Sequence, residues 1–131
     1  MDDWKISAIT RLKEYDAMTA AAENLPAGLA LCRRENRQQL HSRLNNARQW
    51  VALTNRALGA LTPQEQLVLR LLYIAPQKGN VNRLCELLEC EQATVYRRRD
   101  KALQKFTMAL YGKPLLAENL GRQISQNAKI T

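Results

Sequence analysis

A basic stretch near the C-terminal end of the chain carries the side chains best suited to recognising another molecule. Amide, hydroxyl and aromatic groups adjoin a run of arginines and two lysines there: Gln92, Ala93, Thr94, Tyr96, Arg97, Arg98, Arg99, Lys101 and Lys105. In the major groove of DNA, glutamine pairs with adenine, arginine pairs with guanine, and small methyl-bearing side chains contact thymine. The candidates for contacts to base edges are therefore Gln92, Ala93, Thr94, Tyr96 and Arg97.

The remaining basic side chains are better suited to phosphates, which position a protein on DNA without specifying its sequence. They are Arg98, Arg99, Lys101 and Lys105. The alternative is an ordinary solvated face of a helix. Such a face usually interleaves acidic residues, and only Asp100 does so here, so the pattern favours a nucleic-acid contact.

Two helices are needed to present this surface. A long helix is predicted over about 92–111, ended by Gly112 and Pro114, with apolar residues at helical spacing on its inner side: Val95, Ala102, Leu103, Phe106 and Leu110. A helix of barely two turns precedes it from Val81 and stops near Glu89, with Leu84, Cys85 and Leu88 facing inward. Helices joined by so few residues cross steeply and leave the second one outward, so the sequence predicts a helix-turn-helix.

A third helix is predicted just before this pair. Thr62, Pro63 and Glu65 form a capping box with proline at the first helical position, which marks a helix start. The helix is expected to run to about Ala75, where Pro76 ends it. Its predicted buried face consists of Leu67, Val68, Leu71 and Leu72.

The N-terminal half is predicted to form a helical hairpin. A first helix is expected over 3–23, a turn at Asn24–Gly28 because of Pro26, and a second helix over about 29–60. The second helix carries apolar residues at heptad spacing: Leu40, Leu44, Ala47, Val51, Thr54, Leu58 and Leu61. This seam needs a partner, either the first helix or a second subunit. Packing within one chain is favoured because only about three heptads are present.

The composition of the chain indicates an all-α fold. Of 131 residues 46% are hydrophobic, but only 5% are aromatic and five are glycine, which suits helices rather than sheets. A chain of this length forms one compact unit or one domain with a helical appendage. We predict a hairpin over 1–60, a DNA-binding domain over 61–112 and a tail over 113–131 with an amphipathic stretch at 115–124.

The charge of the chain favours a polyanionic partner. The formal net charge is +8, spread along the sequence, although charge does not distinguish DNA from RNA. Three cysteines without a CxxC pair indicate a reducing cytoplasm. Neither a signal peptide nor a membrane-spanning segment is recognisable. His41 has no metal-ligating neighbour at helical spacing, and no catalytic motif is present, so we expect no metal, no cofactor and no enzymatic activity.

The C-terminal half resembles the promoter-reading C-terminal region of bacterial sigma factors. The resemblance covers roughly residues 60–111 and is carried by Leu61, Glu65, Val68, Leu72, Tyr73, Val81, Leu84, Cys85, Leu88, Thr94, Val95 and the run 101–106. Within that group, the Thr-Val-Tyr-Arg-Arg-Arg stretch near the start of the helix predicted over 92–111 is similar to phage transcriptional regulators of the ArpU and RinA type. Two residues depart from the pattern. Glu91 stands where a serine or threonine caps the helix, and Arg98 stands at an apolar position.

These departures lead to two expectations. The Glu91 carboxylate can still cap the helix, and Arg98 either accompanies a slight rotation of the helix or lies along the surface with its stem packed. The resemblance implies a regulator that activates late genes of a phage or prophage in the bacterial cytoplasm. From the residues we expect double-stranded DNA as a partner and an N-terminal hairpin that mediates either a homodimer through its helices or contact with host RNA polymerase. Two alternatives stay open: a DNA-packaging protein like a small terminase subunit, and a module that binds polymerase without reading DNA.

Overall fold

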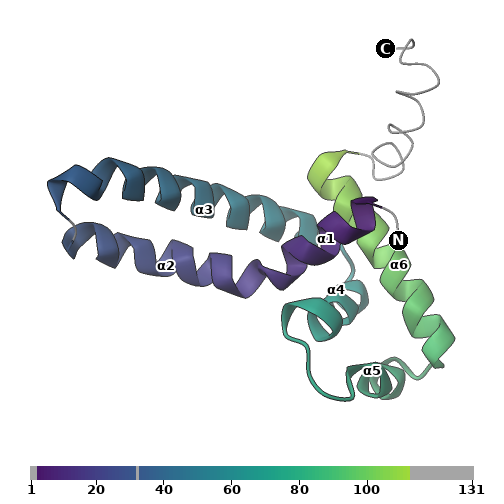
Figure 1. Cartoon of the computed structure of the whole chain (residues 1–131). Coiled ribbons are helices and arrows are strands. Elements are labelled where there is room, and N and C mark those ends of the chain that lie inside the picture. Colours follow the sequence, from purple (N-terminus) through teal and green to yellow (C-terminus); the bar gives the residue numbers. More distant parts are fainter. Residues whose placement is uncertain (1–2, 32, 113–131) are drawn as a thin grey trace, which may run out of the picture.

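The computed structural model describes residues 3–31 and 33–112, and within these ranges it is built of helices without strands (Figure 1). The elements are α1 (Asp3–Lys13), α2 (Tyr15–Leu31), the short 3-10 turn η1 (Arg34–Asn36), α3 (Arg37–Gly59), α4 (Pro63–Leu69), the π-helical turn η2 (Arg70–Ile74), α5 (Asn80–Leu88) and α6 (Gln92–Tyr111). The all-α prediction is confirmed for these residues. The predicted amphipathic stretch at 115–124 lies outside them. None of the described helices is long and apolar enough to cross a membrane.

The predicted turn at Asn24–Gly28 is wrong. Helix α2 continues through Pro26 to Leu31, and the chain reverses between Leu31 and α3. The first helix instead changes direction at Glu14, where hydrogen bonds from Glu14 N to Thr10 O and from Met18 N to Glu14 O bridge α1 and α2. Proline normally destabilises the interior of a helix, because it removes a main-chain hydrogen bond. Pro26 lies on the exposed side of α2, and packing of the opposite side along α3 outweighs the local preference.

Helices α2 and α3 lie side by side and run in opposite directions (Figure 1). The heptad seam of α3 faces inward as predicted: Leu44, Ala47, Thr54, Leu58 and Leu61 are buried, and Leu40 and Val51 are half-buried. Arg11 links α1 to α3. Its Nε donates to Thr54 Oγ1 at 2.8 Å, and its guanidinium lies 4.6 Å from the centre of the Trp50 ring. The seam is therefore covered within the chain.

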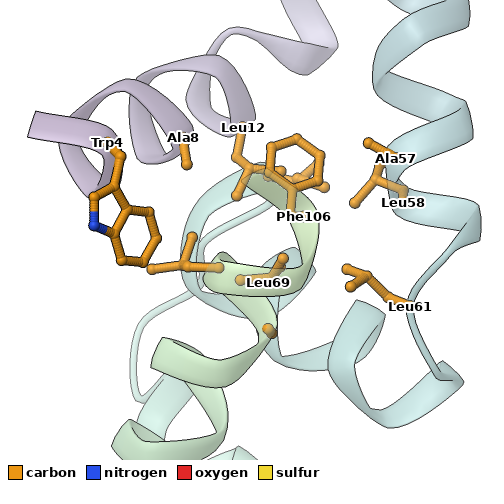
Figure 2. Close-up of a cluster of buried hydrophobic side chains, with 11 residues drawn as sticks. Trp4, Ala8, Leu12, Ala57, Leu58, Leu61, Leu69 and Phe106 are labelled. Atoms are coloured by element: carbon orange, nitrogen blue, oxygen red, sulfur yellow. The ribbon is translucent and has the colours of Figure 1, made fainter. Parts of the chain in front are cut away.

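The main hydrophobic core joins both halves of the sequence (Figure 2). It brings together α1, the end of α3, α4 with η2, and α6 through the residues Trp4, Ala8, Leu12, Ala57, Leu58, Leu61, Leu69, Ile74, Ala102, Leu103 and Phe106. Phe106 is completely buried among them. The core thus crosses the predicted boundary between residues 60 and 61, and α1 packs with the C-terminal helices.

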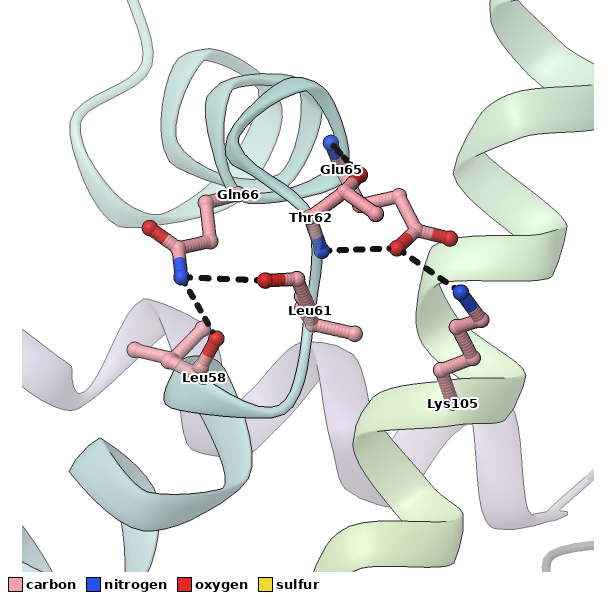
Figure 3. A network of polar contacts seen from close by, with 6 residues as sticks. All are labelled: Leu58, Leu61, Thr62, Glu65, Gln66 and Lys105. Atoms are coloured by element: carbon pink, nitrogen blue, oxygen red, sulfur yellow. Dashed lines mark hydrogen bonds and ion pairs between the residues drawn. The ribbon is translucent and has the colours of Figure 1, made fainter.

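The predicted capping box starts α4 and also fastens it to its neighbours (Figure 3). Thr62 Oγ1 accepts a hydrogen bond from Glu65 N at 3.2 Å, and Glu65 Oε1 accepts one from Thr62 N at 2.9 Å. Lys105 Nζ of α6 reaches the same Glu65 oxygen at 3.1 Å. Burial acts to raise the pKa of Glu65, but the hydrogen bonds from Thr62 and Lys105 outweigh it and hold that pKa below its ordinary value.

A π-helical turn changes which residues of this segment are buried. Ala75 N donates to Arg70 O at 2.8 Å, a bond that spans one residue more than in an α-helix. Of the predicted face, Val68 and Leu71 are buried and Leu67 and Leu72 are half-buried. The prediction missed Leu69 at the end of α4 and Ile74 at the end of η2, which are both buried in the main core. Val68 and Leu71 instead face a second cluster, with Leu84 and Val95.

Candidate nucleic-acid interface

Helices α5 and α6 begin and end within one residue of their predicted positions. Gly79 precedes α5 in the left-handed conformation, with φ of 73°, which glycine adopts without strain. Glu89 ends α5 in the same region, with φ of 53°. Only Glu89, Cys90 and Glu91 then separate the two helices, and Leu84 and Val95, both 0% exposed, pack them together.

One side of α6 is fixed in the protein interior. Val95, Ala102, Leu103 and Phe106 are buried as predicted, and Leu110 is half-buried. Thr107 is buried as well, which its hydroxyl tolerates because Oγ1 donates to Leu103 O at 2.7 Å. These contacts determine how α6 is rotated about its axis, and hence which side chains point outward.

The outward side of α6 carries Ala93, Arg97 and Lys101, four residues apart and all exposed, and Gln92 is exposed at the first residue of the helix. Arg97 makes one long hydrogen bond, from Nε to Ala93 O of its own helix at 3.4 Å. Tyr96 is also exposed, at 40%, and Thr94 is half-buried; these two residues flank the outward side. The first turns of α6 therefore present an amide, a methyl group and two cationic side chains to solvent.

Arg98 and Lys105 lean toward α4. Arg98 is half-buried, and its Nη1 donates to Gln64 Oε1 at 3.2 Å, which matches the expectation that it lies along the surface. Lys105 pairs with Glu65 as described above. A hollow of about 200 Å³ separates the two helices beside them, lined by Thr62, Gln64, Glu65, Val68, Arg98 and Lys101.

Arg99 leans the other way, toward the body of the protein. Its Nη2 pairs with Asp100 Oδ1 at 2.9 Å, and its guanidinium lies 5.1 Å from the centre of the Tyr96 ring. Asp100 also pairs with Lys5 of α1, at 3.5 Å. Burial raises the pKa of the nearby Tyr73 hydroxyl, and the charge of Arg99 and its hydrogen bond partly offset this rise. Arg99 thus faces away from the outward side of α6.

The expected side-chain cap from Glu91 is absent. Glu91 occupies the N-cap position of α6 with extended backbone angles, but its carboxylate makes no capping hydrogen bond. Its main-chain oxygen instead accepts from Thr94 N at 3.0 Å and from Val95 N at 3.1 Å. The carboxylate is consequently not tied to the first turn of α6.

Two residues that position this surface were not predicted. Gln64 holds Arg98 from α4, and Lys5 binds Asp100 from α1. No sequence signal identifies either pair, because the partners are far apart in the chain and meet only once the helices pack. In the described ranges, no three or more histidine, cysteine, aspartate or glutamate residues gather where they could hold a metal ion.

The chain matches no model of a protein family, and neither a curated protein sequence nor a solved structure shows significant similarity to it.

Proposed function

We propose that this protein binds DNA in a sequence-specific manner, with α5, its turn and α6 acting as a helix-turn-helix and α6 as the recognition helix. One observation carries the proposal. The first two turns of α6 expose Ala93 and Arg97 on the side opposite the fully buried Val95, and Gln92 is exposed at the first residue of the helix. A rigidly held helix that projects such side chains fits the major groove, where amide and guanidinium groups recognise base edges.

The contacts divide by position on α6. Gln92, Ala93 and Arg97 would read base edges, with Thr94 and Tyr96 at the margins. Lys101, Arg98 and Lys105 would bind phosphates. Exposed ion pairs stabilise a folded protein by only about 0–1 kcal/mol. Lys105 can therefore leave Glu65 and bind a phosphate with little loss of stability. Arg99 lies on the side of α6 that faces the protein body, where it contacts Asp100 and Tyr96 rather than DNA.

The regulatory role rests on the resemblance to phage regulators. On that basis the protein activates late genes of a phage or prophage in the bacterial cytoplasm, with host RNA polymerase as a further partner. The net charge of +8 supports a polyanionic ligand.

A titration by fluorescence anisotropy tests DNA binding. The labelled duplex carries the DNA that flanks the protein's own coding sequence, and a shuffled duplex of equal length is the control. Three phosphate contacts in each subunit predict that log K falls against log salt with a slope of roughly −3 for one subunit and roughly −5 for the dimer. Tighter binding to the flanking duplex supports sequence reading. Equal affinity for both duplexes contradicts specificity, and no binding at about 50 mM salt removes the proposal.

The same proposal includes a homodimer through the N-terminal helices. Helix α2 contains no buried residue, and its side facing away from α3 repeats by three and four residues. The exposed residues of this repeat are Ala17, Ala20, Asn24, Ala27 and Leu31. Leu31 is 88% exposed. Heptad spacing with small residues suits close packing against a second helix, and one polar residue at such a seam fixes the register.

The mass in solution tests the dimer. Sedimentation equilibrium is expected to give about twice the 14.9 kDa of one chain. Ala20→Glu should shift the protein to the monomer, because it places a charge in the seam. Ala52→Glu, at an exposed alanine of α3, is the matched control and should leave the dimer intact. A monomeric wild type contradicts the dimer, and an assembly of about eight or more chains favours a packaging protein.

A further inference from the structure

Two cysteines meet at the end of α5, next to the turn that leads into α6. Cys85 lies in the last turn of α5, and Cys90 follows the left-handed residue Glu89. Cys90 N donates to Cys85 O at 3.1 Å. This hydrogen bond across six residues, with a left-handed residue inside it, forms a Schellman motif, in which the side chains at these two positions commonly touch.

The hydrogen bond limits the separation of the two cysteines. A carbonyl oxygen lies about 2.4 Å from its own Cα, and an amide nitrogen about 1.46 Å from its own. With 3.1 Å between the oxygen of Cys85 and the nitrogen of Cys90, the two Cα atoms are at most about 7 Å apart. Disulfides usually join Cα atoms about 4.4–6.8 Å apart.

Both cysteines also contact the same small hydrophobic cluster. Both cysteine side chains pack against the cluster formed by Val68, Leu71, Leu84 and Val95. Both are free and only half-buried. A small oxidant can therefore reach them, and the hydrogen bond between their main chains limits the distance between the two residues.

We propose that Cys85 and Cys90 are a redox modification site that forms a reversible disulfide within the chain. With hydrogen peroxide as oxidant, one thiolate attacks a peroxide oxygen, the O–O bond breaks, and the hydroxide released takes up a proton to become water. The resulting sulfenic acid is attacked by the second thiol, the S–S bond forms, and a second water leaves. Two thiols have then lost two electrons and two protons, and one peroxide has become two waters. A thiol reductant reverses the change.

The disulfide would fasten the last turn of α5 to the start of α6. It closes a loop of six residues and holds Glu89 in its left-handed conformation. Because it restricts the unfolded chain, it should raise the Tm by roughly 5–10 °C. The disulfide can form whether or not the proposed function is correct. An effect of the disulfide on DNA affinity, by contrast, rests on the proposed function.

The test uses the full chain with Cys32→Ser, so that two thiols remain, and peroxide followed by alkylation. Intact mass should fall by about 2 Da, alkylation should be lost at both sites, and dithiothreitol should reverse both changes. Cleavage after Glu86 and Glu89 separates the two cysteines, so their peptides stay linked only by a disulfide. The same peptide analysis of the wild type applies if the substitution impairs folding.

Single-cysteine controls, Cys85→Ser and Cys90→Ser, should show neither the linked peptides nor the rise in Tm. The proposal is overturned if oxidised protein gains oxygen atoms as sulfinic acid, forms disulfides between chains, or keeps both thiols open to alkylation. DNA affinity is measured separately on the oxidised and reduced forms. Linked peptides without any DNA binding would sustain the disulfide and count against the DNA-binding proposal alone.

Discussion

Replacing Arg97 with alanine is expected to weaken binding to the target duplex by about 1–3 kcal/mol, or roughly 5- to 150-fold in Kd, and to relax specificity at one base pair. Arg97 is the arginine of the 97–99 run that the structure leaves exposed on the outward side of α6, with one long bond to Ala93. A guanidinium that pairs with guanine in two places loses both hydrogen bonds on truncation. Anisotropy with single-base variants of the duplex measures the effect.

Arg48→Ala is the matched control for this experiment. Arg48 is also an exposed helical arginine, but it lies on α3, and its replacement removes the same charge. We expect it to change affinity only slightly and uniformly across sequences. If both variants weaken binding equally, long-range charge rather than base reading explains the affinity. If Arg97→Ala leaves Kd and specificity unchanged, the role of α6 as recognition helix is refuted.

Replacing Phe106 with alanine is expected to lower the free energy of unfolding by about 3–5 kcal/mol. The ring is fully buried in the core formed by α1, α3, α4 and α6, so its removal leaves a cavity lined from four helices (Figure 2). Domains commonly have about 5–15 kcal/mol of stability, so this variant keeps only a fraction of it. Urea unfolding followed by circular dichroism measures the loss.

Met108→Ala provides the comparison on the same helix. Met108 is 49% exposed, so its replacement should change stability by about 0.5 kcal/mol or less. Because the core crosses the boundary at residues 60–61, Phe106→Ala should shift one cooperative transition of the whole described chain. Two transitions, of which only one moves, would show instead that the N-terminal helices fold independently of the C-terminal ones.

The direction in which each arginine of the 97–99 run points determines which partner that arginine can contact. From the sequence, Arg97 was predicted to contact base edges, and Arg98 and Arg99 were predicted to contact phosphates. In the structure they diverge because successive residues of a helix lie about 100° apart. Arg97 faces solvent, Arg98 reaches Gln64 and Arg99 reaches Asp100. The proposed base contact therefore falls on one arginine, and the expected effects of the three substitutions differ.

Local patterns in the chain were enough to predict α5, α6 and the capping box at Thr62 and Glu65. These features depend on interactions among residues within about one helical turn, so a short stretch of sequence contains their causes. The heptad seam of α3 was predictable for the same reason. The spacing favoured a partner helix in the same chain but left a second subunit open. The folded chain shows that α1 and α2 cover the seam.

Packing between distant segments settled the rest. Pro26 stays inside α2 because the helix lies along α3, and Leu69 and Ile74 are buried because α1, the end of α3 and α6 pack around them. Arg98 and Gln64 are 34 positions apart, and Lys5 meets Asp100 from the opposite end of the chain. Such pairs form only when helices dock, and docking depends on the shape of whole surfaces, which the spacing of residues along one helix does not encode.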